Sequence, residues 1–551
     1  MKIDIEQLLQ QGIEAHKEGK LQQAENFYQA ILESQPSNSH ANHNLGLLTA
    51  SSNNVSAAIP LFKAALKTNP NIEQFWLSYI EALLAINELD EAETFSRKAL
   101  DLKQDFIKVN YILSIILTKL GKLDEAEIYS RKVTTLKPEF AEAHNNLGNI
   151  LKELSRLSEA EASLRQAITL KSDFAEAHYN LGNILEEQGK LNDAEASLRQ
   201  AITLKPDFAE AHSNLGNILK EIGRLDEAVV SLNQALLLKP DLIDAIFNLS
   251  IVHEYMNNLN ESAALLKKLM EIDKNNQGLK AAVQLAIFKF LEKDFSESKK
   301  ILLACHKIQE MKSFDFNNHK LYQSYLLKIL NNNEKKIPTT NHDESKIKLY
   351  VIGDSHSLVS HGQHIKFSAK DFLCKSLLVP GCKQFDLGND VSNKFKYKFK
   401  KIFCSIPESS QILLTIGEID CRLDGGIIKH KNRYPKKNIT ALIKDTVENY
   451  LNYISTLNLS FKHNIIIQGV PCPNINITNI SMEKIEELIK VIRYFNVVLK
   501  EKSKKIGFEF LDVYKLTDNG NGFSNNFWHL DEHHLSLKGI QEAWRIHTTT
   551  N

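Results

Sequence analysis

A serine, a histidine and an aspartate in the second half of this 551-residue chain carry the side chains that nucleophilic catalysis needs. The segment GDSH (353–356) follows an apolar stretch, and the segment DEHH (531–534) lies near the C-terminus. A serine hydroxyl becomes a nucleophile when an imidazole accepts its proton and a carboxylate orients that imidazole. We therefore predict Ser355 as a nucleophile, His534 as its base and Asp531 as the orienting carboxylate.

The elements around these residues have the pattern of an α/β domain. Helical patterns at 439–457 and 482–504 alternate with short apolar segments. These segments predict strands at 347–353, 376–381, 411–417, 464–470 and 507–514. Such alternation predicts a parallel sheet with helices on both faces, and we expect one domain of this kind at 347–551. Ligands bind beyond the carboxyl ends of strands in such sheets, and Ser355 and Gly381 stand at two of these ends.

The order of these segments resembles the SGNH (GDSL-like) hydrolase superfamily. That family has GDS after the first strand, a lone glycine after the second, GxND after the third and DxxH near the end. The GDS triplet (353–355), Gly381 and the DxxH spacing from Asp531 to His534 match this order. The spacing favours His534 as the base, with His533 as the alternative. The resemblance implies a three-layer α/β fold and a serine hydrolase or acyltransferase that acts on ester bonds.

The third segment departs from the family pattern. It reads Gly417-Glu418-Ile419-Asp420, so that isoleucine stands where the family has an asparagine that donates to the oxyanion. Such a donor stabilises a transition state by about 2.7–4 kcal/mol. The resemblance leaves the backbone N–H groups of Ser355 and Gly381 as oxyanion donors. Side chains expected to contact substrate are His356, Glu418, Asp420 and Arg422, although Arg422 could instead form a structural ion pair and His356 could only bind backbone.

Two functions remain open for this half of the chain. The GDSH form with a late HLS (534–536) is similar to SGNH domains attached to bacterial polysaccharide acyltransferases, which implies an esterase or O-acyltransferase for acyl esters of a carbohydrate. Ile419 favours the alternative, a catalytically weak or inactive scaffold that binds a glycan or a protein. The sequence does not distinguish hydrolysis from transfer.

The first half of the chain is repetitive. Near-identical segments begin at Ala141, Ala175 and Ala209, a period of 34 residues. The same register extends from Ile5 to a looser copy near Leu279, which gives nine units over 5–312. Each unit has two apolar-periodic helices around a short turn, and most end at a proline. The pattern resembles the tetratricopeptide (TPR) repeat, which implies an all-α solenoid with a concave groove.

Asparagines recur at one position of these repeats. They are Asn44, Asn146, Asn180, Asn214 and Asn248. The array is similar to the asparagine-laddered TPR domain of O-GlcNAc transferases, and this resemblance implies that the groove binds a peptide or protein. The alternative is a spacer whose near-identical units merely copy their asparagines.

The remaining features limit the other classes of function. Lys+Arg and Asp+Glu both number 67, so bulk charge does not favour a nucleic-acid partner. The C-terminal histidines lack cysteine neighbours and an HExxH pattern, and we expect no metal and no cofactor. The start shows no secretory h-region, and no membrane span is expected, so the chain is interpreted as a cytoplasmic bacterial protein. A helix that closes the array and a polar linker are expected at 313–346. The lysine-rich segment 394–401 is expected to be a solvated, partly buried helix or loop, and the alternative is that it binds a glycan.

Overall fold

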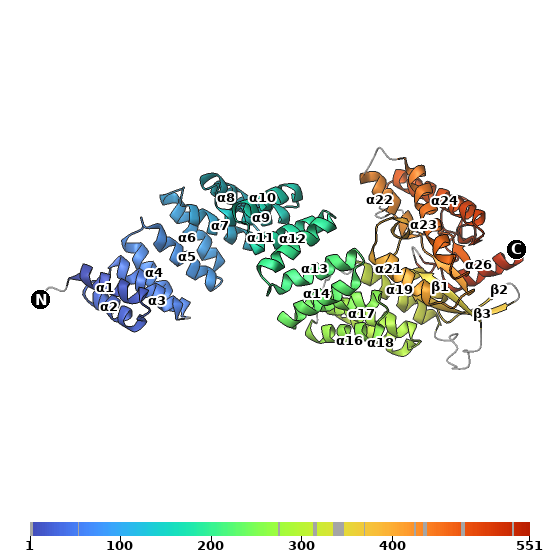
Figure 1. Ribbon diagram of the computed structural model, residues 1–551, viewed down its shortest axis with the longest axis horizontal. Coiled ribbons are helices and arrows are strands. Elements are labelled where there is room, and N and C mark those ends of the chain that lie inside the picture. The colour runs from blue at the N-terminus through green and yellow to red at the C-terminus, as the bar shows by residue number, and fades with distance from the viewer. Residues whose placement is uncertain are drawn as a thin grey trace. The chain divides into compact units, whose positions relative to one another are not determined.

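The computed structural model describes most of the chain. The residues described are 4–52, 54–273, 276–311, 317–333, 347–367, 370–423, 426–433, 438–474, 480–531 and 534–550. Contacts divide the chain into two compact units, Met1–Ala211 and His212–Asn551. In Figure 1 the first unit runs from blue to green along the colour bar, and the second from green to red.

The first unit consists of antiparallel helix pairs. Its helices are α1 (Ile5–Lys17), α2 (Leu21–Ser34), α3 (Ser39–Ser51), α4 (Val55–Thr68), α5 (Glu73–Ala85), α6 (Leu89–Leu102), α7 (Ile107–Lys119), α8 (Leu123–Leu136), α9 (Ala141–Glu153), α10 (Leu157–Leu170), α11 (Ala175–Glu187) and α12 (Leu191–Leu204). The first helix of each pair begins at the residue that the 34-residue register predicts. Within a pair the helices approach closely at glycine, because a Cβ atom on Gly148 would lie 2.7 Å from Leu164 Cγ.

The repeats continue into the second unit. Helix α13 (Ala209–Glu221) crosses the division, and it is followed by α14 (Leu225–Leu238), α15 (Ile243–Tyr255), α16 (Leu259–Ile272), α17 (Asn276–Leu291), α18 (Phe295–Met311) and α19 (Asn317–Asn333). The ninth pair starts at Asn276 rather than near Leu279, because the Asp273 carboxylate accepts the backbone N–H groups of Gln277 and Gly278. The expected closing helix is α19. It ends at Asn333, within the range 313–346 in which the sequence predicted this helix and a linker, while 334–346 lie outside the described residues.

The described part of the second unit contains a six-stranded mixed sheet. Its strands are β1 (Ile347–Gly353), β2 (His364–Phe367), β3 (Lys370–Leu378), β4 (Gln411–Thr415), β5 (Asn464–Gln468) and β6 (Glu509–Leu511), in the order β2-β3-β1-β4-β5-β6. All neighbours are parallel except β2 and β3, which pair antiparallel. The expectation of a wholly parallel sheet was therefore wrong at this edge. Strand β2 was missed, because four residues give too short an alternation to separate it from a loop.

Helices connect and cover these strands. They are η1 (Ser355–Ser360), α20 (Gln384–Gly388), α21 (Lys394–Ser405), η2 (Ile419–Cys421), α22 (Gly426–Arg433), α23 (Ile439–Asn458), α24 (Met482–Lys505), α25 (Val513–Thr517) and α26 (Leu537–Thr550). In the described residues, no helix is both long and apolar enough to cross a membrane.

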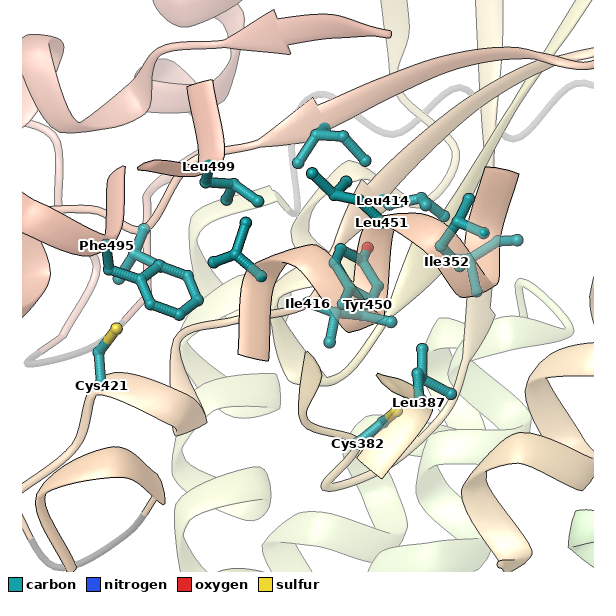
Figure 2. Packing of buried hydrophobic residues seen from close by; sticks show 14 of the residues in the cluster. Ile352, Cys382, Leu387, Leu414, Ile416, Cys421, Tyr450, Leu451, Phe495 and Leu499 are labelled. Atoms are coloured by element: carbon teal, nitrogen blue, oxygen red, sulfur yellow. The ribbon is translucent and has the colours of Figure 1, made fainter. Parts of the chain in front are cut away.

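One face of the sheet packs against α20, α21, α23 and α24. Ile352 of β1 and Leu414 of β4 belong to one buried cluster with Tyr450 of α23 and with Phe495 and Leu499 of α24. Figure 2 shows these side chains converging between the strands and the helices. Strand residues alternate between faces, so the neighbours of Ile352 and Leu414 point to the opposite side.

The opposite face is covered by α26 together with helices of the repeat region. Val351 and Leu413 share a buried cluster with Trp544 of α26, but also with Phe290 of α17 and Leu326 of α19. The final repeat helices and the sheet therefore have one continuous core. The domain boundaries expected at 312 and 347 stay a prediction, since the compact second unit contains segments from both sides of them.

Candidate active site

The end of β1 places Ser355 at the edge of the sheet. Gly353 is required there, because a Cβ atom would lie 1.9 Å from Thr415 Oγ1 on the neighbouring strand. The Asp354 side chain then caps η1 by accepting the backbone N–H of His356 at 3.1 Å. Ser355 is the first residue of this short helix, so the turn fixes the position of its hydroxyl.

Ser355, His534 and Asp531 lie in hydrogen-bond contact. Ser355 Oγ is 2.8 Å from His534 Nε2, and His534 Nδ1 is 2.8 Å and 3.0 Å from the two Asp531 carboxylate oxygens. The backbone N–H of His534 also donates to Asp531 at 2.8 Å. An ionised carboxylate only accepts hydrogen bonds, so Nδ1 carries the imidazole proton and Nε2 accepts from the serine.

Burial sets the protonation state of this imidazole. His534 is 5% exposed, and burial lowers the pKa of its ring below the ordinary value, while the Asp531 side chain opposes that shift. A neutral imidazole at neutral pH has a lone pair free to accept the serine proton. The alternative base, His533, lies outside the described residues.

A second imidazole–carboxylate pair lies beside the first. His356 Nδ1 is 2.8 Å from Asp354 Oδ1, and the His356 and His534 rings are 4.6 Å apart. The expectation that His356 would contact substrate or backbone did not include this pairing. One ligand atom from each of Asp354, His356 and Glu418 falls within 4.8 Å of the others, a geometry that a divalent cation could use. Both Asp354 and Glu418 already bind protein partners, so these contacts account for the cluster without an ion.

The turn after β3 brings Gly381 to the same edge of the sheet. Gly381 has φ +68°, in the left-handed region that favours glycine. The turn is held against the end of β1, because the backbone N–H of Val379 donates to the Gly353 carbonyl at 2.7 Å. The role of the Ser355 and Gly381 backbone N–H groups as oxyanion donors stays a prediction.

The third segment is held mainly by protein contacts. Arg422 forms an ion pair with Glu418 at 2.6 Å, the structural alternative for this arginine. Asp420 is fully buried and accepts the backbone N–H groups of Gln384 and Phe385 at 2.7 Å and 3.2 Å. Burial raises the pKa of Asp420 to about 7. Its bonds to the first two residues of α20 support an anchoring role more than a substrate contact.

Three residues of the site region were missed by sequence reasoning. The buried Gln384 amide donates to the Ile416 carbonyl at 2.7 Å and so fastens the turn after β4. Tyr325 of α19 stacks on His534 with ring centroids 3.8 Å apart, and Tyr322, three positions earlier on the same helix, packs against the buried cluster that includes Leu358 of η1. The two tyrosines belong to the closing helix of the repeats, and no motif links that helix to the sheet.

The repeated asparagines all lie on first helices and are half-buried. Asn146 donates to Ser114 Oγ at 2.8 Å, and Asn180 donates to Asn145 Oδ1 at 2.9 Å, in each case in the preceding repeat. Asn44 and Asn248 are also engaged, with His43 at 3.3 Å and Lys220 at 3.0 Å, and Asn214 has partners as well. The ladder therefore links neighbouring repeats, whether or not it also binds a ligand.

The basic run 394–401 forms α21, which docks on repeat helices. Lys394 pairs with Glu221 of α13 at 2.6 Å, and Lys398 pairs with Glu254 of α15 at 2.7 Å. The Lys398 and Glu254 side chains are each only 5% exposed. The sequence indicated a solvated, partly buried helix or loop, and the structure has a partly buried helix whose lysines neutralise acidic residues of the repeats.

Family comparisons agree with the helix pairs. Tetratricopeptide repeat models match residues 9–71, 49–116, 107–140, 148–189, 182–223 and 209–242. The N-terminal region is a tetratricopeptide repeat array.

Several solved structures match part of the chain at low TM-scores. MamA is 24% identical over 29% of this chain and 94% of its own, with a TM-score of 0.28. YrrB, described as a TPR protein with an unusual peptide-binding site, is 22% identical over 34% of this chain and 96% of its own, with a TM-score of 0.29. A tetratricopeptide repeat protein from Parabacteroides merdae is 16% identical over 45% of this chain and 98% of its own, with a TM-score of 0.38. The search of curated proteins gave no match.

Proposed function

We propose that the second unit is an SGNH-like serine esterase or O-acyltransferase that acts on acyl esters, with a carbohydrate ester as the substrate class. The observation that carries this proposal is the hydrogen-bonded chain from Ser355 through His534 to Asp531. These residues come from segments 179 positions apart, and a purely structural serine would need no such alignment. The tetratricopeptide repeats are typical of a scaffold for protein–protein interaction, and in this proposal their groove binds a peptide or protein partner.

The geometry supports a two-step acyl transfer. Ser355 Oγ attacks the ester carbonyl carbon while its proton passes to His534 Nε2, and the carbonyl oxygen becomes an oxyanion. The tetrahedral intermediate then expels the alcohol, which takes the proton from His534 and leaves an acyl group on Ser355. Water or a sugar hydroxyl next gives its proton to His534, attacks the acyl carbon and releases Ser355 with its proton restored.

Asp531 supports both steps without transferring a proton itself. Its carboxylate accepts from Nδ1 and from the backbone N–H of His534, so it fixes the ring orientation and stabilises the imidazolium. The neutral resting state of His534, which burial favours, suits a group that must first act as a base.

Two observations favour a second candidate, a binding scaffold with weak or no turnover. Ser355 is only 8% exposed, and Ile419 offers no side-chain donor at the position where the resembling family has asparagine. In this alternative the residues around Ser355 bind a ligand that is not cleaved.

Covalent labelling separates the two candidates. The full-length protein is treated with a fluorophosphonate probe, and the labelled residue is located by peptide mass spectrometry, alongside hydrolysis of p-nitrophenyl acetate. We expect a label on Ser355 that is lost in Ser355→Ala and strongly reduced in His534→Ala, because members of a triad act as a unit. No label and no turnover in the wild type, with Ile419→Asn equally inert, would replace the enzyme by the scaffold.

A further inference from the structure

The ring of Tyr325 lies against the imidazole of His534. Their centroids are 3.8 Å apart and their planes are inclined by 18°, which is the geometry of stacked rings. Tyr325 belongs to α19, the closing helix of the repeats, whereas His534 lies just before α26, the last helix of the chain. The contact therefore brings a side chain of the repeat region onto the candidate base.

The hydrogen bonds of His534 act only at the edge of its ring. Nε2 accepts from Ser355 Oγ at 2.8 Å, and Nδ1 donates to Asp531 at 2.8 Å. Bonds at the edge fix the two nitrogen atoms, but they resist a tilt of the ring out of its plane only weakly. A second ring stacked on one face limits that tilt. The limit matters, because a misplacement of about 1 Å can slow an enzyme by about 10²-fold.

The same contact has an electrostatic effect when the imidazole becomes charged. His534 turns into an imidazolium cation when Nε2 takes the proton of Ser355. The face of an aromatic ring is negative, and it attracts a cation within about 6 Å of the ring centroid, most strongly where water is excluded. His534 is 5% exposed and Tyr325 is 0% exposed, so water screens this attraction little.

We infer that Tyr325 is a positioning residue for the acyl transfer, whose ring holds the plane of His534 and stabilises the imidazolium that forms during the reaction; the inference rests on the proposed function. Tyr325 exchanges no proton in this role and acts through His534 alone. It serves both steps, because the imidazole is protonated once in each of them.

The surroundings of Tyr325 hold its ring in place before the reaction. Leu326 and Leu330 of the same helix are buried in the cluster that α19 shares with the sheet. The buried Gln323 amide donates to the Leu302 carbonyl at 3.0 Å and fastens this turn of α19 to α18. A ring that is held in this way needs no reorganisation when the charge appears, which is the condition for effective electrostatic stabilisation of a transition state.

Other titratable groups also face His534. Asp531 pairs with its Nδ1, the ring of His356 in η1 lies 4.6 Å away, and Glu418 after β4 acts on the imidazole through space. Burial has the largest effect and lowers the pKa of His534, whereas Asp531 and Glu418 raise it and His356 lowers it. Burial also raises the pKa of the Tyr325 phenol well above its usual value, so that this side chain stays neutral. A substitution of Tyr325 alone leaves the charged groups in the protein and changes only the ring.

The test compares ring substitutions in the full-length protein. Tyr325→Leu removes the aromatic face, Tyr325→Phe keeps it, and Phe290→Leu removes a ring from the same buried cluster, where Phe290 packs on His361. With p-nitrophenyl acetate, Tyr325→Leu should lower kcat by about 5–30-fold, because the imidazolium loses its stabilisation. Tyr325→Phe and Phe290→Leu should stay within about threefold of the wild type. Melting temperatures show whether Tyr325→Leu and Phe290→Leu lose similar stability.

The acid limb of the pH–rate profile gives a readout that a loss of packing does not imitate. Stabilisation of the imidazolium by the ring raises the pKa of His534, so Tyr325→Leu should move the midpoint of kcat/KM to lower pH by about 0.5–1.5 pH units. Water that entered a cavity left by the ring would hydrate the imidazolium and move the midpoint to higher pH. An unchanged or higher midpoint would overturn the inference, and so would a Tyr325→Phe variant as impaired as Tyr325→Leu.

A variant that preserves the shape of the ring keeps the test decisive if Tyr325→Leu does not fold. Pentafluorophenylalanine at position 325 has nearly the shape of phenylalanine, but fluorination reverses the charge distribution that makes the ring face negative. Its midpoint should lie at lower pH than that of Tyr325→Phe. Equal midpoints in these two proteins would refute the electrostatic role of the ring.

Histidine NMR separates the failure of this inference from the failure of the proposed function. The Cε1–H signal of His534, identified by its loss in His534→Ala, reports the pKa of the imidazole without turnover. If the wild type is labelled by fluorophosphonate at Ser355 and this pKa is the same in Tyr325→Leu, only the role of Tyr325 is refuted. If the wild type is neither labelled nor active, the proposed enzyme falls and the positioning role falls with it, whatever the pKa.

Discussion

Breaking the buried ion pair between Lys398 and Glu254 should lower the stability of the second unit strongly, because it leaves a buried charge without its partner. Its atoms are 2.7 Å apart, and both side chains are 5% exposed. Glu254 also accepts a hydrogen bond from the Gln284 amide at 2.7 Å, and the Lys398 ammonium lies 5.2 Å from the centre of the Tyr255 ring. Replacing Lys398 by Met keeps the length of the side chain but removes its charge. Of the two donors named above, only the Gln284 amide then remains for the Glu254 carboxylate.

The expected loss follows from the desolvation of that carboxylate. Removing one partner of a buried pair costs about 3–5 kcal/mol, because the other charge stays out of water without its counter-charge. A second substitution, Glu254→Gln, removes the stranded charge while keeping an acceptor for Gln284. The double variant should therefore be more stable than Lys398→Met alone by about 2 kcal/mol or more, by the same reasoning.

Urea unfolding measured by tryptophan fluorescence tests this expectation. Trp528 and Trp544 both lie in the second unit, so a Trp76→Phe background restricts the signal to that unit. The matched control is Lys505→Met, because Lys505 pairs with Glu501 at 2.8 Å while both side chains are more than half exposed. The control should unfold at the same urea concentration as the parent. If Lys398→Met were no more destabilising than Lys505→Met, the carboxylate would be hydrated and α21 would not be seated on α15.

Three further predictions concern the site, the division of the chain and the groove. Because burial lowers the pKa of His534 and only the neutral ring accepts a proton, kcat/KM should be level at neutral pH and fall only below about pH 6.5; a midpoint above pH 7 in a pH–rate profile would contradict the assignment. A fragment of residues 1–208 should be helical and monomeric by circular dichroism and gel filtration, whereas 1–330 should self-associate, because α17 and α19 would expose the face that packs on the sheet; a monomeric 1–330 that binds no hydrophobic dye would contradict this. The ladder variant replaces three asparagines together: Asn146→Ala, Asn180→Ala and Asn214→Ala. It should no longer bind peptides selected on an array, and it should lose about 0.5–1.5 kcal/mol of stability for each lost hydrogen bond. The control variant replaces one exposed threonine on the second helix of each of three repeats: Thr135→Ala, Thr169→Ala and Thr203→Ala. It should bind the peptides as the wild type does. If both triple variants bound equally well, the ladder would be a structural feature only.

Local patterns in the sequence predicted the elements that depend on local physics. The 34-residue register predicted where the first helices of the repeats begin, because each repeat carries the same apolar periodicity and the same closing turn. The apolar run before Gly353 predicted β1 to the residue. The expectation that Ser355 and His534 lie together followed from the needs of a serine nucleophile and from the DxxH spacing of the resembling family.

Contacts between distant segments could not be predicted in the same way. No periodicity indicates that α21 neutralises Glu221 and Glu254, since a lysine-rich helix has the same pattern whether it faces water or carboxylates. The antiparallel β2 was missed because its four residues carry little pattern. The role of the closing helix was missed because Tyr322 and Tyr325 belong to no motif of either half.

One signal for the shared core was present in the sequence. Helix α17 contains the segment AAVQLAIFKFL (281–291), which is apolar around most of its circumference, and almost all of its residues are buried. A helix with only repeat neighbours needs one apolar stripe, so a second apolar face requires another surface to cover it. In this chain the sheet supplies that surface through Leu349 and Val351.

This shared core makes the last repeats part of the candidate active site in a mechanical sense. Tyr325 lies against His534, and the same helix buries Leu326 and Leu330 against the core of the sheet. A displacement of α19 by a fraction of an ångström would change the contact on the imidazole, because packed interiors transmit strain instead of absorbing it. The positions of the last repeat helices therefore affect the geometry of the Ser355–His534 pair. The earlier repeats, which belong to the first unit, are free of this requirement.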